Sequence, residues 1–233
     1  DANIETKSHS YSHRPLRFIF ICNNYHYISC KLQELLESSF VASNQITAAA
    51  ATKSATTTNT APSSPNLKRD PEVMIKAVKA AISKKLDPYA LKVTKSIKDV
   101  VSETWDLTLN SMRYDNCKDV IKPDRKGQYG RSTRNDIKKR LTNFNKEFLA
   151  IYNEQRKYTV FGMELKERLR KAMIEAVIPV YVRFDEEFCT IPFTKNKSKY
   201  VSYSASSMEQ MLLQLYDELR EEADERTVVD DDY

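Results

Sequence analysis

Apolar side chains recur at every third or fourth residue through most of this chain, and this repeat limits the possible folds more than any other feature. The clearest run follows Gly162: Leu165, Leu169, Ala172, Met173, Ala176, Val177, Val180, Tyr181, Phe184 and Phe188. A second run has the same spacing: Ile137, Leu141, Phe144, Phe148 and Ile151. Because 3.6 residues make one helical turn, each run forms a stripe on one face of an α-helix. We therefore expect an all-α protein.

Weaker copies of the repeat predict the remaining helices. They are expected over residues 15–38, 71–86, 88–113 and 206–223, and the helix of the second run is expected to begin at Ser132 or Thr133. Asp87-Pro88 is expected to interrupt one helix and start the next, because proline lacks a backbone donor. Ser206 and Glu209 have the spacing of a capping box. Connections after residue 132 are short, which favours antiparallel helical bundles.

Composition excludes several classes of protein. The chain has only three glycines, which argues against a hairpin-rich β fold and against a glycine-rich phosphate loop. Its four cysteines do not have the spacing of a metal site, and two of its three histidines, His9 and His13, lie near the start of the chain. We find no catalytic motif, so we expect no enzymatic activity, no cofactor and no metal.

Changes in composition along the chain divide it into four parts. Residues 1–40 are expected to form the N-terminal helix of a truncated bundle, and residues 71–220 a C-terminal helical bundle domain. Residues 41–70 are rich in alanine, threonine and serine, and we expect a disordered insertion there because they offer little surface to bury. Residues 221–233 are expected to be a disordered acidic tail.

Charge is unevenly distributed between these parts. The whole chain carries +5, whereas residues 221–233 hold seven acids and one base, so the preceding 220 residues carry +11. A basic body indicates an anionic partner, and the acidic tail could compete for the same basic surface.

The most concentrated basic feature lies in residues 192–203, between the last two predicted helices. Lys195, Lys197 and Lys199 occupy every second position there, with Phe193 and Tyr200 beside them. Flexible ammonium groups next to aromatic rings suit the phosphates of a membrane surface. The alternative is a plain polar turn exposed to solvent.

A second basic group lies near the start of the helix predicted over residues 132–151, and it comprises Arg134, Lys138 and Lys139. Basic charge at a helix N-terminus opposes the helix dipole, which suggests that these residues serve a partner. A solvated basic face is the alternative. Nucleic acid is not expected, because aromatic residues do not interleave with the bases and no recognised module is present.

Three sequence motifs resemble those of one family. They are I-F-I-C-N-N-Y-H-Y-I at residues 19–28, I-K-K-R-L-T-N-F-N-K-E-F at residues 137–148 and P-F-T-K-N-K-S-K-Y-V-S-Y at residues 192–203. In this order they resemble the exocyst complex component 7 family, the seventy-kilodalton exocyst subunit. The resemblance covers residues 16–40 and about 90–220.

This resemblance implies a fold and a function. The family fold is a rod of stacked helical bundles, of which this chain would be the C-terminal part. The implied function is tethering of secretory vesicles to the plasma membrane, with the domain bound peripherally to phosphatidylinositol 4,5-bisphosphate on the cytosolic face. Other exocyst subunits and Rho-family small GTPases are the implied partners. A helical scaffold that binds only protein remains the alternative, and a basic nucleic-acid-binding module is a more distant one.

The resemblance also points to particular residues in the basic loop. The family has a K-Y-x-K-Y motif whose lysines are implicated in lipid binding; Lys199 matches the first lysine, whereas Ser202 occupies the position of the second. Lys195 also aligns, and Lys197 is an additional base that could substitute for the missing one. Arg134, Lys138, Lys139 and Arg140 correspond to a basic run in the family and would extend the lipid-binding surface.

Overall fold

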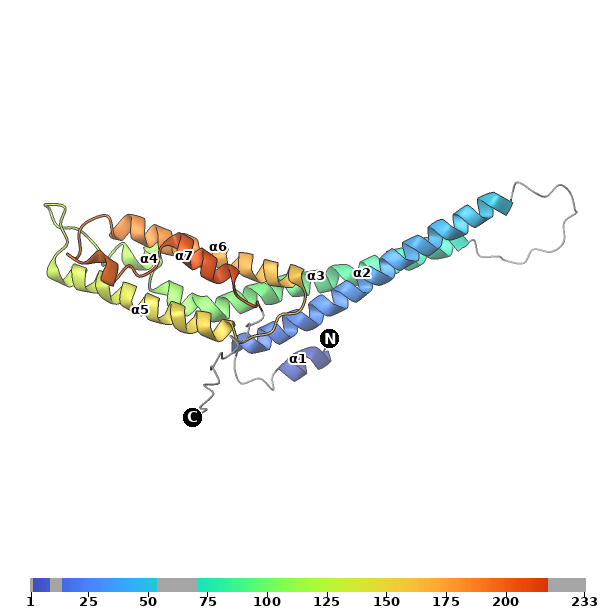
Figure 1. The fold of residues 1–233 in the computed structure, drawn as a ribbon, viewed down its shortest axis with the longest axis horizontal. Helices are drawn as coiled ribbons and strands as arrows, with labels where there is room; N and C mark the ends of the chain where they lie inside the picture. The colour runs from blue at the N-terminus through green and yellow to red at the C-terminus, as the bar shows by residue number, and fades with distance from the viewer. Residues whose placement is uncertain (1, 9–13, 54–70, 218–233) are drawn as a thin grey trace, which may run out of the picture. The chain divides into compact units, whose positions relative to one another are not determined.

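The computed structural model describes residues 2–8, 14–53 and 71–217, and every regular element in these ranges is helical. The elements are α1 (Ala2–Ser8), α2 (Arg14–Lys53), α3 (Pro71–Asn110), α4 (Tyr114–Cys117), α5 (Arg131–Gln155), α6 (Met163–Phe188), the 3-10 turn η1 (Lys197–Lys199) and α7 (Ala205–Leu213). The expectation of an all-α protein is therefore confirmed (Figure 1).

The chain forms two compact units, and the division between them lies inside α3. The first unit ends at Ile97 and contains α1, most of α2 and the first part of α3. The second begins at Lys98 and contains the remaining helices, together with Arg14–Leu16. The contacts thus divide the chain within a helix rather than at residue 71, where the change in composition suggested that a domain begins.

α2 is longer than the sequence repeat indicated. The helix expected to end near Ser38 continues to Lys53, so the first part of the insertion expected over residues 41–70 is helical. Four consecutive alanines at residues 48–51 favour this extension, because alanine has the highest intrinsic helix propensity. Residues 54–70 and the acidic tail at 221–233 lie outside the described residues.

α3 runs without interruption through Pro88, where the sequence suggested a break. Proline removes one backbone hydrogen bond, but the residues around it favour a helix, and contacts within the first unit hold this turn. The Tyr89 ring lies 6.0 Å from the Tyr25 ring of α2, and Val93 is buried one turn later.

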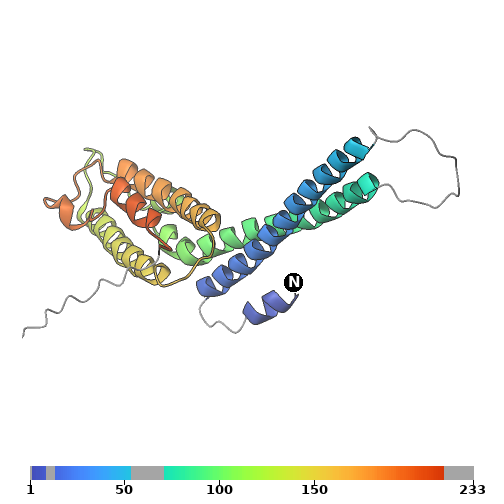
Figure 2. The ribbon, with the colours of Figure 1, turned by 45° about the vertical axis from the view of Figure 1, so that its right-hand side comes forward.

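The core of the second unit is a column of aromatic rings contributed by α3, α5 and α6. The ring of Phe148 lies 5.7 Å from that of Trp105 and 5.9 Å from that of Phe144, and Phe144 in turn lies 5.3 Å from Tyr181. Figures 1 and 2 show α5, α6 and α7 side by side in this unit. The core positions predicted on α5 and α6 include these rings, and burial of each such ring stabilises the fold by about 2–3 kcal/mol.

The helix ends differ from those predicted. α5 begins at Arg131 after Gly130, not at a Ser132 or Thr133 cap. α7 is capped by Ser204, which exchanges hydrogen bonds of 3.0 and 2.9 Å with Ser207, so the predicted Ser206–Glu209 box is wrong. α7 also ends at Leu213, short of the predicted residue 223.

Candidate functional site

Residues 192–203, which we call the lysine loop, lie between α6 and α7 and carry the three lysines on an ordered backbone. Phe193 is buried with 2% of its surface exposed, and its ring meets the Tyr200 ring edge-on at 6.3 Å. The carbonyl of Lys197 accepts hydrogen bonds from the backbone of Tyr200 (3.0 Å) and Val201 (2.9 Å), which closes the η1 turn. Phe193 therefore anchors the loop and is not available as an aromatic contact for a membrane.

α5 is hydrogen-bonded to the C-terminal part of this loop. Asn145 Nδ2 donates hydrogen bonds to the carbonyl oxygen of Tyr200 (2.7 Å) and to Ser202 Oγ (2.9 Å). The Lys138 ammonium lies 5.7 Å from the centre of the Tyr200 ring, within the range of a cation–π contact. Figures 1 and 2 both show the η1 turn beside the first half of α5. The fold thus brings Lys138 to the lysine loop.

The three loop lysines are all exposed, but they differ in their partners. Lys197 Nζ lies 3.2 Å from Asp185 Oδ1 on α6 and 3.5 Å from the Cys189 carbonyl oxygen, so its charge is partly compensated within the fold. Within residues 2–8, 14–53 and 71–217, neither Lys195 nor Lys199 forms an ion pair. The uncompensated positive charge of the loop therefore comes from Lys195 and Lys199.

Two titratable groups near the loop, the Cys189 thiol and the Tyr181 hydroxyl, remain protonated at neutral pH. Burial, with the nearby Asp185 carboxylate, raises the pKa of the Cys189 thiol to about 12, while Lys197 opposes that shift. Burial likewise raises the pKa of Tyr181, whose hydroxyl donates a 2.6 Å hydrogen bond to the carbonyl of Tyr203. Neither group therefore adds charge to the loop at neutral pH, and the charge there comes from the lysines and Asp185.

The basic residues of α5 do not all contribute to this surface. Arg134 is exposed one turn before Lys138 and so lies on the same side of the helix, whereas Lys139 is rotated by about 100°. Arg140, which continues this basic run, is mostly buried: its Nε donates to Asp136 Oδ2 at 2.7 Å, and its guanidinium also donates to the carbonyl of Ser111. Arg140 is therefore a structural residue.

Sequence reasoning missed two polar residues that shape the site, Asn145 and Asp185. Both lie on helices, at positions that a helical repeat assigns only to a polar face. No local pattern indicates that Asn145 reaches the 200–202 backbone or that Asp185 reaches Lys197, because these contacts join distant parts of the chain.

Two other kinds of feature are absent from the described ranges. No group of histidine, cysteine and acidic side chains there is arranged to hold a metal ion. No helix in those ranges combines the length and the apolar content needed to cross a membrane.

The fold and the site define an all-α protein with an exposed basic loop before its last helix. Residues 79–214 match the model of one family, described as the C-terminal region of the Exo70 exocyst complex subunit. The chain belongs to this family, as the three motifs indicated. The motif at residues 19–28 lies outside the matched range.

Curated relatives from animals and plants agree with this assignment. Exocyst complex component 7 of Drosophila melanogaster is 34% identical over 85 residues, which are 36% of this chain and 12% of that protein. Exocyst complex component EXO70A1 of Arabidopsis thaliana is 34% identical over 82 residues, 35% of this chain and 13% of the relative. Human exocyst complex component 7 is 31% identical over 81 residues, which are 35% of this chain and 11% of that protein. The chain thus matches only a small part of each relative's length.

Proposed function

We propose that this chain is the membrane-binding part of an exocyst subunit and helps to tether secretory vesicles to the plasma membrane. It binds phosphatidylinositol 4,5-bisphosphate peripherally on the cytosolic face. Lys195, Lys199 and Lys138 provide the main contacts, Lys197 and Arg134 extend the basic surface, and Lys139, rotated by about 100° on α5, lies at its edge. Membership of the family supports the role in the exocyst, and the relatives are themselves named as components of that complex.

The observation that carries the lipid contact is a pair of lysines on an anchored turn, Lys195 and Lys199, for which the described part of the chain provides no carboxylate partner, with Lys138 beside Tyr200. A lysine near an anionic membrane contributes about 1 kcal/mol. Three such residues provide a useful but reversible attachment, as a tether requires. No catalytic step, cofactor or nucleic acid is needed for this role.

A second function, as a scaffold that binds only protein, has one observation in its favour. Leu107 on α3 is 90% exposed at a surface hollow lined otherwise by polar residues, where its apolar side chain is accessible to a protein partner. Other exocyst subunits are the partners that membership of the family suggests, and Rho-family small GTPases are a further proposal from the resemblance. Under this alternative, the lysine loop only keeps the surface solvated.

Vesicle co-sedimentation separates the two functions. We expect the chain to bind vesicles containing phosphatidylinositol 4,5-bisphosphate more strongly than phosphatidylserine vesicles of equal total charge. Binding should weaken between 0.1 M and 1 M salt, because the screening length falls from about 10 Å to about 3 Å. Equal binding to both lipids would contradict recognition of the phosphoinositide, and no binding to either would favour the scaffold.

Ser202 provides a test in the opposite direction, a gain of binding. The substitution Ser202→Lys places a lysine where the resemblance expects one, and we predict about fivefold stronger binding to phosphoinositide vesicles, the effect of roughly 1 kcal/mol. Ser202→Met is the matched control, since it also removes the hydroxyl that accepts from Asn145 but adds no charge. If the lysine variant binds no better than the methionine variant, position 202 does not face the lipid.

A further inference from the structure

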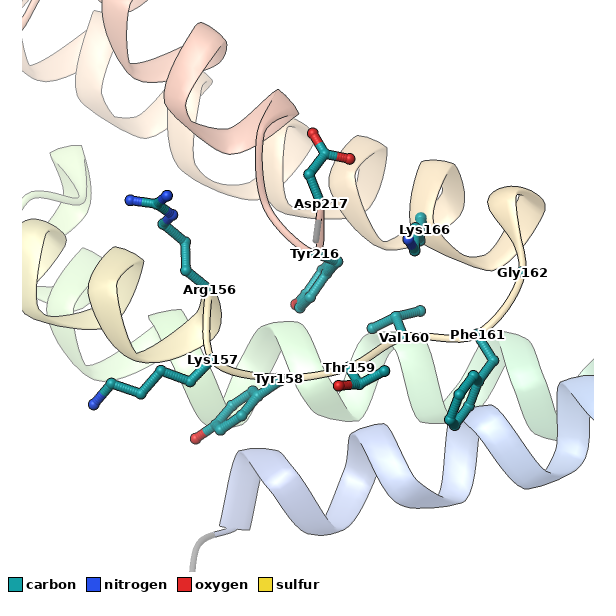
Figure 3. A pocket seen from close by; sticks show the side chains of 10 residues that line it. All are labelled: Arg156, Lys157, Tyr158, Thr159, Val160, Phe161, Gly162, Lys166, Tyr216 and Asp217. Carbon is teal, nitrogen blue, oxygen red and sulfur yellow. The ribbon is translucent and has the colours of Figure 1, made fainter. Parts of the chain in front are cut away.

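A basic cavity lies at the other end of α5 from the lysine loop. Its volume is about 300 Å³, and it is enclosed by the α5–α6 connection, the start of α6 and the chain that follows α7. Figure 3 shows Tyr216 projecting into it, with Arg156 on the side of α5 and Lys166 on the side of α6. Asp217 is the one acidic residue among those that line it, against Arg156, Lys157 and Lys166.

The chain leaves α7 along a fixed path at the wall of this cavity. Tyr216 adopts a left-handed backbone conformation with φ of 63°, and its buried hydroxyl donates to Gln155 Oε1 at 2.7 Å. Arg170 donates to the Leu215 carbonyl oxygen at 2.7 Å and pairs with the Asp217 carboxylate. Whatever follows Asp217 therefore begins at the cavity.

Some of the cations around the cavity are available to form ion pairs with further carboxylates. Lys157 pairs with Glu154 at 2.8 Å and points away from the cavity in Figure 3. Arg156 and Lys166 have no carboxylate partner among the described residues.

The start of α6 adds a second attraction for negative charge. Gly162 precedes this 26-residue helix and lines the cavity. Because glycine has no side chain, it cannot accept hydrogen bonds from the backbone amides of the first helical turn. Such a helix end favours negative charge, and it lies beside Lys166.

We propose that the C-terminal acidic segment, residues 218–233, folds back and binds this cavity. The segment has eight acids and two bases, and five acids follow Asp217 closely: Glu218, Glu221, Glu222, Asp224 and Glu225. Glu221 is four residues beyond Asp217, a reach of up to about 14 Å. The segment therefore binds Arg156, Lys166 and the uncapped end of α6 through its first carboxylates.

The acidic segment could bind either the cavity or the lysine loop, and the position of the cavity favours the cavity. Lys138, beside the lysine loop, and Gln155, beside the cavity, are 17 positions apart on α5, which corresponds to about 25 Å along the helix. Because Asp217 lines the cavity, the chain that continues from it has a shorter path to Arg156 and Lys166 than to Lys195 and Lys199. The proposed contact therefore does not involve the lysine loop and is independent of what the loop binds.

Zero-length carbodiimide crosslinking of the full chain, followed by mass spectrometry, tests the proposal. We expect amide crosslinks from Lys166 to Glu221, Glu222 or neighbouring acids within one molecule. Their yield should fall at least twofold in Arg156→Glu, an effect of the size expected for exposed ion pairs, and more in 1 M salt. Lys171→Glu is the matched control on α6, because Lys171 lies within 3.9 Å of Glu175 and does not line the cavity.

The outcomes of this experiment are distinct. Crosslinks from the segment to Lys195 or Lys199 in place of Lys166 would show that it covers the lysine loop and would overturn the proposal. Crosslinks found only between isotopically light and heavy molecules would overturn it as well, as would their complete absence. The wild-type pattern decides between these results even if Arg156→Glu fails to fold, which the fluorescence of Trp105 would reveal.

Discussion

The double reversal Lys195→Glu with Lys199→Glu is expected to weaken binding to phosphoinositide vesicles by at least about 100-fold. Each lysine contributes about 1 kcal/mol near an anionic surface, and each reversal replaces that attraction with repulsion. Neither side chain has an ion pair among the described residues, so the substitutions leave no buried partner behind. Vesicle co-sedimentation at fixed salt measures the loss directly.

Two controls identify the cause of that loss. Lys84→Glu with Lys171→Glu changes the net charge by the same amount at exposed positions outside the loop segment, and we expect it to keep most of the binding. Lys197→Ala should lower binding less than fivefold, because Asp185 already compensates part of this charge. If this control double reversal weakened binding as much as the loop variant, net charge and not the loop would attract the vesicle.

Phe148→Ala is expected to destabilise the second unit by about 3–5 kcal/mol, the cost of deleting a fully buried aromatic side chain. Its ring is 0% exposed and lies against Trp105, Phe144 and Tyr203, so no neighbour can fill the space without leaving its own contacts. Urea unfolding followed by the fluorescence of Trp105, the chain's single tryptophan, measures the effect, with a fall in midpoint of roughly 1–3 M.

Leu107→Ala is the matched control for this prediction. Leu107 lies on α3 in the same unit but is 90% exposed, so its substitution should change the free energy of unfolding by less than about 0.5 kcal/mol. Similar losses from the two substitutions would mean that Leu107 is buried in solution or that Phe148 is not. In both cases the assignment of the core would have to be revised.

The helices and their buried faces could be predicted because they depend on local spacing. The stripes on α5 and α6 require only that apolar side chains repeat with the helical period, and Phe144, Phe148, Tyr181 and Phe184 are buried as expected. The lysine loop was also visible in the sequence, since Lys195, Lys197 and Lys199 are neighbours in the chain. Membership of the family, indicated by three motifs, is confirmed by the match over residues 79–214.

Features that depend on contacts between distant residues could not be predicted. The sequence made the three lysines look equivalent, and only the approach of Asp185 on α6 distinguishes Lys197. Ser202 looked like a missing lysine, whereas the fold uses its hydroxyl to accept a hydrogen bond from Asn145. The α7 cap was misplaced by two residues because several serines compete for that position, and the backbone conformation at Ser204 decides between them.

The buried Phe193 and the η1 turn affect how strongly the lysine loop can bind. Ordering one residue of backbone costs roughly 1–2 kcal/mol in conformational entropy, so a loop that became ordered only on contact would lose most of the attraction of its lysines. Here Phe193 and the hydrogen bonds from Tyr200 and Val201 to the Lys197 carbonyl oxygen order the backbone beforehand. Under the proposed function, an arriving anion has to restrict only the lysine side chains, so a few weak charge contacts would suffice for measurable affinity.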